Sequence, residues 1–340
     1  MENINWGELG FAYMKTPYNV RCVYKNGKWG ELEISSSEYM DMHIAASCLH
    51  YGQEAFEGLK AFRGVDGKVR IFRLEENAKR MIRSAEYLEM AQPSVELFSQ
   101  AVIKAVQLNS EFIPPYETGA SLYIRPVLVG TGAQVGVKPA TEYTLIVFVT
   151  PVGPYFKGGE KRISGVVYRN YDRSGANGTG HIKAGGNYGS SMKSTVISHH
   201  DGYDAVVYLD PREKTYIDEC GAANFFGIKD GTTYITPEST SILPSITNMS
   251  LMQLAQDMGL KAERRKIALE ELPSIAEAAA CGTAAVLTKI AKIDDPEKGV
   301  SYTFAPVENS WCDKLYNAYR DIQYGRVKDT HNWNTIVEVK

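Results

Sequence analysis

Two long β-rich runs place the strongest constraint on the fold. The segments SLYIRPVLVG (121–130) and EYTLIVFVTPVG (142–153) are rich in strand-forming residues, and the second is apolar enough to be a buried strand. A proline- and glycine-rich stretch, GPYFKGGE, follows them directly. Such a break after a completed strand is typical of a domain boundary. We therefore expect a smaller N-terminal α/β domain over 1–151, an interdomain loop over 152–162 and a larger, β-rich C-terminal domain with flanking helices over 163–340.

The remaining local patterns mix strands and helices. Apolar and polar residues alternate over 18–34 around Asn26-Gly27, which predicts a hairpin with a type I′ turn. Apolar residues at helical spacing predict helices at about 75–90 and 94–112. Further helices are expected at about 187–200, 246–258, 274–280 and 310–322, and further strands at 67–74, 204–210, 224–229, 232–236 and 333–340. Because the βαβ spacing is not regular, an α+β fold is favoured over a doubly wound sheet.

Size and charge exclude several classes of function. The chain has 340 residues, which suits two domains, and its 44% apolar and 23% charged residues are ordinary for a globular protein. The net charge of −3 gives no electrostatic reason to expect nucleic acid or an anionic membrane as a partner. No apolar run approaches the ~20 residues of a membrane helix, and the N-terminus lacks the pattern of a signal peptide.

The cysteines and histidines do not indicate a metal site. The five cysteines are widely spread, odd in number and without a CxxC pair, and the six histidines form no HExxH pair. This usage suits buried thiols in a reducing cytoplasm better than a disulfide framework or zinc. We expect a cytoplasmic protein without a metal.

One lysine, Lys183, lies within the glycine-rich run GTGHIKAGGNYGSS (178–191). Glycines serve where backbone turns sharply or approaches something closely. A nucleotide-hydrolase phosphate loop is excluded, because Ala184 rather than Ser or Thr follows the lysine. Two interpretations stay open on this stretch alone: a solvated loop, or a lysine that forms a Schiff base with a carbonyl cofactor.

A Schiff-base cofactor such as pyridoxal phosphate would need further groups. Ser245 and Thr247 lie at the start of an apolar-periodic helix, where free N–H groups can bind a phosphate. Thr283 in CGTAAV and Arg80 in NAKRM are further phosphate candidates. Glu219 could hold the pyridine nitrogen protonated. A helix cap or a surface charge remains the alternative interpretation for each of them.

The chain as a whole resembles the branched-chain amino acid aminotransferases, pyridoxal-phosphate enzymes of fold type IV. The resemblance rests on the joint order and spacing of nine segments along nearly the whole chain. These are HYGQEAFEGLKAFRG (50–64), NAKRM (77–81), SLYIRPVLVGT (121–131), TPVGPYF (150–156), KAGGNYGSSM (183–192), DECGAANFF (218–226), ILPSITNMS (242–250), CGTAAV (281–286) and DIQYGR (321–326).

The resemblance implies roles for the cofactor-binding residues. Lys183 would carry the Schiff base and move the proton between the substrate and the cofactor. Tyr188 would bind the ring oxygen, and Glu219 would pair with the pyridine nitrogen. The implied phosphate ligands are Arg80, the backbone amides of Ile246 and Thr247, and Thr283.

It also implies a substrate pocket. Arg125, in the YIR segment, matches a residue near the side-chain pocket, and the turn at Thr283 and Ala284 would receive the substrate carboxylate. The match for an aromatic residue near the N-terminus is Tyr13, with Phe11 as the alternative. The implied aromatic wall consists of Tyr51, Phe56, Tyr123 and Tyr155.

The implied activity is transamination of L-leucine, L-isoleucine and L-valine with 2-oxoglutarate, giving the branched-chain 2-oxo acids and L-glutamate by a ping-pong mechanism. The family also implies a homodimer. Two other functions stay open: a D-amino acid aminotransferase or aminodeoxychorismate lyase of the same fold, and a cofactor-binding protein without catalysis. D-amino acid aminotransferases and aminodeoxychorismate lyases generally lack the FEGLKAFRG and VGPYF segments, which are present here.

Overall fold

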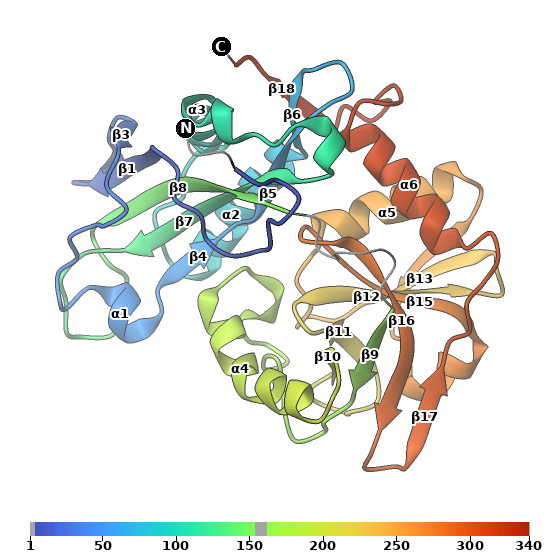
Figure 1. Cartoon of the computed structure of the whole chain (residues 1–340). Coiled ribbons are helices and arrows are strands. Elements are labelled where there is room, and N and C mark those ends of the chain that lie inside the picture. Colours follow the sequence, from blue (N-terminus) through green and yellow to red (C-terminus); the bar gives the residue numbers. More distant parts are fainter. Residues whose placement is uncertain (1–3, 154–161, 340) are drawn as a thin grey trace. The chain divides into compact units, whose positions relative to one another are not determined.

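The computed structural model describes residues 4–153 and 162–339. The chain forms two compact units (Figure 1). Unit 1 comprises Met1–Tyr155, Ile182–Gly185 and Asp321–Lys340, and unit 2 comprises Phe156–His181 and Gly186–Arg320. The domain boundaries expected at 151 and 163 stay a prediction, because most of the loop between them lies outside the described residues. Lys183, which we expected within the second domain, has its contacts in unit 1.

Unit 1 is built on one antiparallel sheet. Its strands follow the order β18-β6-β5-β7-β8-β1-β2, with β3 paired to β1 and β4 paired to β7. The strands are β1 (Asn19–Lys25), β2 (Lys28–Trp29), β3 (Glu33–Ser35), β4 (Glu54–Phe56), β5 (Leu59–Arg63), β6 (Val69–Phe72), β7 (Ser121–Gly130), β8 (Tyr143–Val152) and β18 (Asn334–Val337). The expected hairpin is confirmed, because Asn26 and Gly27 join β1 to β2 with φ of 54° and 79°.

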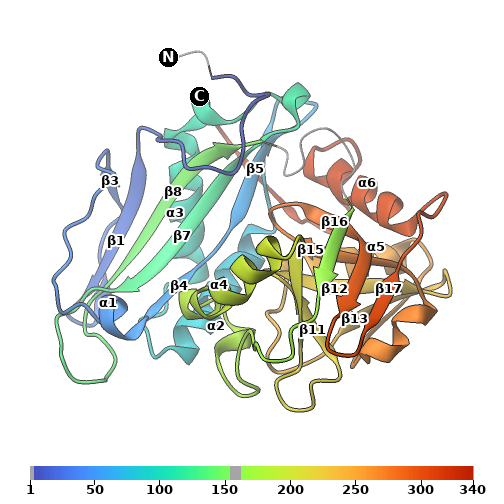
Figure 2. The same cartoon turned by 60° about the horizontal axis from the view of Figure 1, so that its bottom comes forward.

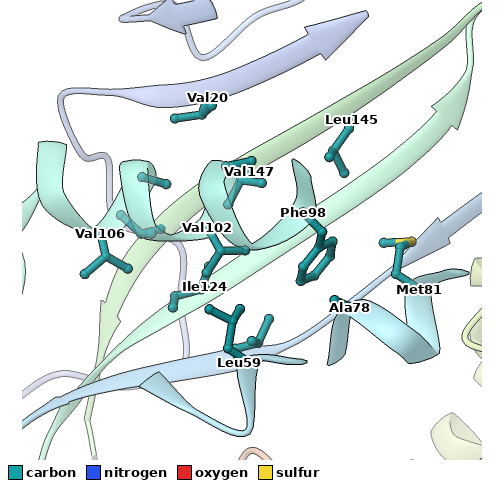
Figure 3. Close-up of a cluster of buried hydrophobic side chains, with 14 of the residues drawn as sticks. Val20, Leu59, Ala78, Met81, Phe98, Val102, Val106, Ile124, Leu145 and Val147 are labelled. Carbon is teal, nitrogen blue, oxygen red and sulfur yellow. The ribbon is translucent and has the colours of Figure 1, made fainter. Parts of the chain in front are cut away.

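Three α-helices complete unit 1: α1 (Ser47–Tyr51), α2 (Leu74–Tyr87) and α3 (Val95–Leu108). Short 3₁₀ turns follow at Ser110–Phe112 and Tyr116–Thr118. Figure 3 shows Phe98, Val102 and Val106 of α3 beside Ile124 and Val147 of the sheet, in one buried cluster. This apolar face holds the helices on the sheet, and each fully buried side chain contributes about 1.5–3 kcal/mol.

The strand pairings of unit 2 close into a ring, and Figure 2 shows its members β11, β12, β15 and β16. The path β11-β10-β9-β16-β15-β12 returns on itself because β11 also pairs with β12, and β13, β14 and β17 extend it. The strands are β9 (Ile163–Val166), β10 (Ala205–Leu209), β11 (Ile217–Cys220), β12 (Ala223–Lys229), β13 (Thr233–Pro237), β14 (Lys261–Arg265), β15 (Ile275–Gly282), β16 (Val286–Asp295) and β17 (Val300–Thr303). The helices that lie wholly or mostly in unit 2 are α4 (Gly185–His200), α5 (Ile246–Asp257) and α6 (Trp311–Gln323). Short 3₁₀ turns lie at Thr179–His181 and Leu269–Ser274.

The helix expected at 274–280 is wrong, because this segment lies in β15. Its alanine-rich sequence, SIAEAAA, favours a helix by intrinsic propensity. In the fold it pairs on one side with β12 and on the other with β16, and most of its residues are buried. Strand pairing on both edges, together with burial, outweighs the intrinsic helix propensity of these alanines. The helices expected near 75–90, 94–112, 187–200, 246–258 and 310–322 are confirmed.

No helix within the described residues has the length and apolar character needed to cross a membrane. All five cysteines are free thiols, and all except Cys48 are buried.

Candidate active site

Backbone hydrogen bonds fix Lys183 beside the strand β4. The amide of Phe56 donates to the carbonyl of Lys183 at 3.1 Å, and the amide of Lys183 donates to Ser84 Oγ at 3.0 Å. The next residue, Ala184, forms a bridge with Ala55 of β4. A Cβ atom at Gly185 would collide with the carboxylate of Glu54, so the bare backbone at this glycine leaves room for that carboxylate.

The amine of Lys183 lies in an apolar and positively charged environment. Its Nζ is 4.6 Å from the centre of the Phe56 ring. Burial, and after it the positive charge of Arg80, lower the pKa of Lys183 to about 8, whereas Glu57 and Tyr123 act in the opposite direction. Near neutral pH, a much larger share of this amine is neutral than in an exposed lysine, so it can act as a nucleophile.

Arg80 lies close to this lysine and forms a buried ion pair that the sequence analysis did not predict. The carboxylate of Glu57 accepts from Arg80 Nε at 2.7 Å and from Arg80 Nη2 at 2.8 Å. Nothing in the sequence around Glu57 marks it as the partner of Arg80, which lies 23 residues away.

Phe56, Tyr123 and Arg125 form the aromatic part of this group. The guanidinium carbon of Arg125 lies 4.8 Å from the Phe56 ring centre and 5.2 Å from that of Tyr123. Arg125 Nη2 also donates to the Tyr123 hydroxyl at 3.0 Å. Among the described residues, the buried Nε of Arg125 has no hydrogen-bond partner. A buried donor of this kind is costly to leave unpaired and is available to a ligand.

The N-terminal segment contributes Phe11 rather than Tyr13 to this group. The Phe11 ring lies edge-on to Tyr123 at 5.1 Å between centres, and Lys60 Nζ lies 5.8 Å from the Phe11 ring centre. Tyr13 instead packs near Phe148 and donates its hydroxyl to Glu38 at 2.7 Å. Because the two residues face different neighbours, Phe11 is the better candidate for the pocket.

Two other expected pocket residues are not brought into this group. Tyr51 lies in α1, is 41% exposed, and donates its hydroxyl to the carbonyl of Val135. Its ring lies 6.2 Å from that of His50, measured between the ring centres, and neither Val135 nor His50 belongs to the lysine group. Tyr155 lies outside the described residues.

In unit 2, Glu219 on β11 is buried and receives several hydrogen bonds. Its Oε2 lies 2.8 Å from Arg173 Nε, and its Oε1 accepts from the amide of Leu243 at 2.7 Å and from Asn224 Nδ2 at 3.3 Å. Only 2% of Glu219 is exposed. A carboxylate can be buried at acceptable cost when it is paired and hydrogen-bonded in this way. Arg173 and Asn224 are functional candidates that the sequence analysis missed, since neither has a local signature.

The same network reaches the start of α5. Asn248 Nδ2 donates to Asn224 Oδ1 at 3.1 Å, and the amide of Asn248 donates to the Oγ of Ser245, the N-cap of the helix, at 3.2 Å. Ile246 and Thr247 are buried in the first turn. The first N–H groups of a helix have no acceptors within it, and together with the helix dipole they favour an anion. Glu219 and the start of α5 are therefore joined through two asparagines.

Thr283 and Ala284 lie in the turn that joins β15 to β16. The residues flanking the turn, Gly282 and Val286, pair with each other, and Cys281 pairs with Asn224 of β12. The beginning of the turn therefore lies beside the asparagine that contacts Glu219. Tyr188 lies on α4, half-buried, five residues after Lys183.

Comparisons with known proteins show the family to which the chain belongs. Residues 54–293 match the amino-transferase class IV family. A branched-chain-amino-acid aminotransferase from Helicobacter pylori is 45% identical over 98% of both chains.

Solved structures show the same fold. A branched-chain amino acid aminotransferase from Thermobaculum terrenum in its PLP form aligns with a TM-score of 0.77 and 25% identity, covering 96% of this chain and 100% of that one. A second, the "T.th." branched-chain amino acid aminotransferase complexed with N-(5'-phosphopyridoxyl)-L-glutamate, aligns with a TM-score of 0.73 and 26% identity, covering 93% and 98% of the two chains.

The fold and site define a two-domain α+β enzyme of fold type IV. The chain belongs to the class IV aminotransferase family, and its resemblance to the branched-chain aminotransferases is confirmed. The residues present also fit the cofactor of that family. They provide a lysine of lowered pKa, a helix end suited to a phosphate, a buried carboxylate and a buried arginine donor without a protein partner among the described residues.

Proposed function

We propose that the enzyme transfers the amino group of L-leucine, L-isoleucine and L-valine to 2-oxoglutarate by a ping-pong mechanism. The observation that carries the proposal is the amine of Lys183, with a pKa of about 8, beside the Phe56 ring and the charges of Arg80 and Arg125. The names of the relatives support the branched-chain amino acids as substrates. The phosphopyridoxyl-glutamate bound by the second solved relative supports glutamate and 2-oxoglutarate as the second pair.

In this proposal the cofactor is pyridoxal 5'-phosphate, which when bound supplies an aldehyde for Lys183 and a ring that withdraws electrons from the substrate. Glu219 would accept a hydrogen bond from its ring nitrogen, and Tyr188 would donate one to its ring oxygen. The proposed phosphate ligands are Arg80, the amides of Ile246 and Thr247, and Thr283. Burial of Glu219 next to Arg173 supports a lasting negative charge at that position.

Lys183 would have two tasks. Its Nζ would form a Schiff base with the cofactor aldehyde, and later accept the proton from the α-carbon of the amino acid. A base works best when its pKa lies near the working pH, and a pKa of about 8 meets that condition better than that of an exposed lysine. The backbone bonds to Phe56 and Ser84 hold the chain at Lys183 in one position while the amine changes its protonation.

The substrate side chain would lie against the rings of Phe56 and Tyr123. These rings can bury the side chain of leucine or isoleucine, worth about 1.5–3 kcal/mol. In the other half-reaction, the γ-carboxylate of glutamate would be bound by Arg125 and the Tyr123 hydroxyl, which are already joined at 3.0 Å. One group of residues can therefore accept both an apolar and an acidic side chain. The turn at Thr283 and Ala284 is proposed to bind the α-carboxylate.

The proposal is tested with a steady-state panel of L-amino acids against 2-oxoglutarate, with Lys183→Ala as the inactive control. We expect activity on leucine, isoleucine and valine and none for the variant. Activity on D-alanine without activity on L-leucine would reassign the enzyme to a D-amino acid aminotransferase. Absence of bound cofactor and of a borohydride-reducible lysine would indicate a protein without catalysis.

We also propose that the enzyme is a cytoplasmic homodimer. Four apolar side chains of unit 1 are strongly exposed: Ile44, Leu49, Val135 and Val137, at 84%, 60%, 85% and 85%. The segments that carry them are joined, because the amide of Gln134 donates to the carbonyl of Ala45 at 2.9 Å. An exposed apolar surface of this kind is typical of a contact between copies. Tyr51, which is bonded to Val135, would then serve the pocket of the second copy. Free thiols support the cytoplasmic location.

A further inference from the structure

Glu57 is fixed in a position where its carboxylate has no access to water. It directly follows Phe56, the residue whose ring lies beside the amine of Lys183. Its amide donates to the carbonyl of Pro126 in β7 at 2.8 Å, so its backbone is held to the neighbouring strand. The residue is 0% exposed. A carboxylate at such a site is costly unless it is paired, and the pairing that it makes therefore matters.

The pairing with Arg80 uses both oxygens of the Glu57 carboxylate. Glu57 Oε1 accepts from Nε at 2.7 Å and Oε2 accepts from Nη2 at 2.8 Å, and Arg80 is only 5% exposed. Two parallel bonds fix the direction of a guanidinium as well as its position, which a single bond does not. The amide of Gly58 adds a further donor to Oε2 at 3.3 Å.

The pair is connected to Lys183 through one serine. Ser84 Oγ accepts from the amide of Lys183 at 3.0 Å and donates to the carbonyl of Arg80 at 3.0 Å, and this serine is fully buried. The helix turn that holds Arg80 therefore also holds the backbone of Lys183. The charged and titratable groups that act on the lysine amine are Arg80, Glu57, Tyr123 and Arg125.

We infer that Glu57 is a positioning residue, which fixes the direction of the Arg80 guanidinium beside Lys183. The inference rests on the proposed function, in which Arg80 binds the cofactor phosphate and Lys183 condenses with the aldehyde. Two consequences follow. Without the carboxylate, Arg80 loses its fixed direction and binds a phosphate less well. In addition, Lys183 loses a nearby negative charge that raises its pKa, so its amine becomes a weaker base.

The test compares two aldehydes in the full-length enzyme: pyridoxal 5'-phosphate and pyridoxal, which lacks the phosphate. The absorbance of the lysine-bound form measures the affinity for each, and the ratio of the two affinities measures the contribution of the phosphate. In Glu57→Gln, which keeps the side-chain volume, we expect this ratio to fall about 10-fold. The pH midpoint for condensation with pyridoxal should move down by about 1 unit.

Two further variants keep the test decisive. Glu57→Asp retains the charge but shortens the reach, so the phosphate ratio should also fall while the pH midpoint moves less. Glu75→Gln, which removes an exposed carboxylate paired with Lys79 on the same helix, should change neither value. If Glu57→Gln does not fold, Glu57→Asp alone decides the matter.

The outcomes separate this inference from the proposed function. If Glu57 acted only as a counter-charge to Arg80, it would weaken phosphate binding, and its replacement would leave the phosphate ratio unchanged or raise it. An unchanged or increased ratio in Glu57→Gln and Glu57→Asp would therefore overturn the inference. The proposed function would survive that result. A wild-type enzyme whose Lys183 does not condense with pyridoxal 5'-phosphate would overturn both.

Discussion

Arg173 and Glu219 form a buried ion pair in which Nε and Oε2 are 2.8 Å apart. They are 8% and 2% exposed. Arg173 also donates from Nη1 to the carbonyls of Gly180 and Ser241, at 3.2 and 2.9 Å. One guanidinium thus connects the proposed partner of the pyridine nitrogen with the backbone that precedes Lys183 and α5.

Replacement of Arg173 should strongly destabilise the enzyme. Arg173→Met would leave the carboxylate of Glu219 buried without its counter-charge, and breaking one partner of a buried pair costs about 3–5 kcal/mol. The free energy of unfolding in urea measures the loss. Arg265→Met is the control, because Arg265 pairs with Glu271 at a partly exposed site. It should cost about 1 kcal/mol or less. Equal losses in the two variants would contradict this prediction.

Lys183 should reduce the stability of the cofactor-free enzyme in a way that depends on pH. Its folded-state pKa of about 8 lies below the unfolded value of ~10.4, so the unfolded chain binds more protons between these limits. The resulting reduction in the free energy of unfolding is fully present below pH ~8 and disappears as the pH rises through ~10.4.

We therefore expect cofactor-free Lys183→Met to exceed the wild type in free energy of unfolding by about 1–3 kcal/mol at about pH 7. The difference should decrease towards a pH of about 10.4. Denaturant unfolding at several pH values measures it, with the exposed Lys193→Met as control. A difference that stays constant with pH would show that the amine titrates normally.

Two glycines near the lysine in sequence should respond oppositely to alanine. A Cβ atom at Gly180 would lie 2.1 Å from the backbone oxygen of Ser241, whereas Gly189, inside α4, has nothing within 4 Å. Gly180→Ala should lower the free energy of unfolding by about 1–3 kcal/mol, because backbone must move. Gly189→Ala should raise it by about 0.5–1 kcal/mol through helix propensity. Chemical denaturation checks both, and a neutral Gly180→Ala would contradict the close packing.

Arg125→Met should affect the two half-reactions unequally. The loss of a charge-assisted hydrogen bond of about 1.5–3 kcal/mol should lower kcat/KM for glutamate roughly 10- to 100-fold. The value for leucine should change much less, since its side chain makes only apolar contacts. Arg326→Met, which removes another arginine that lies over tyrosine rings, is the control. Equal losses for leucine and glutamate would show that Arg125 has another role.

Much of the local structure was predictable because it depends on neighbours in sequence. Asn26-Gly27 form the expected hairpin turn, and Ser245 caps α5 at the expected position. The roles expected for Lys183 and Glu219 came from joint resemblance across nine segments, since each residue alone also had an ordinary structural interpretation.

Other features depend on residues far apart in sequence and needed the tertiary structure. The segment 274–280 reads as a helix by propensity, yet it becomes β15 because β12 and β16 pair with both of its edges. The pairing of Glu57 with Arg80 and the packing of Phe11 on Tyr123 have no local signature.

The sequence by itself therefore determined the elements whose hydrogen bonds close within a few residues, and the chemical types available for the site. Only the tertiary structure decided which charges neutralise one another, because strand pairing and helix packing bring together groups separated by tens of residues. The distances between these groups in the folded chain control their burial and electrostatics, and hence the lowered pKa of Lys183.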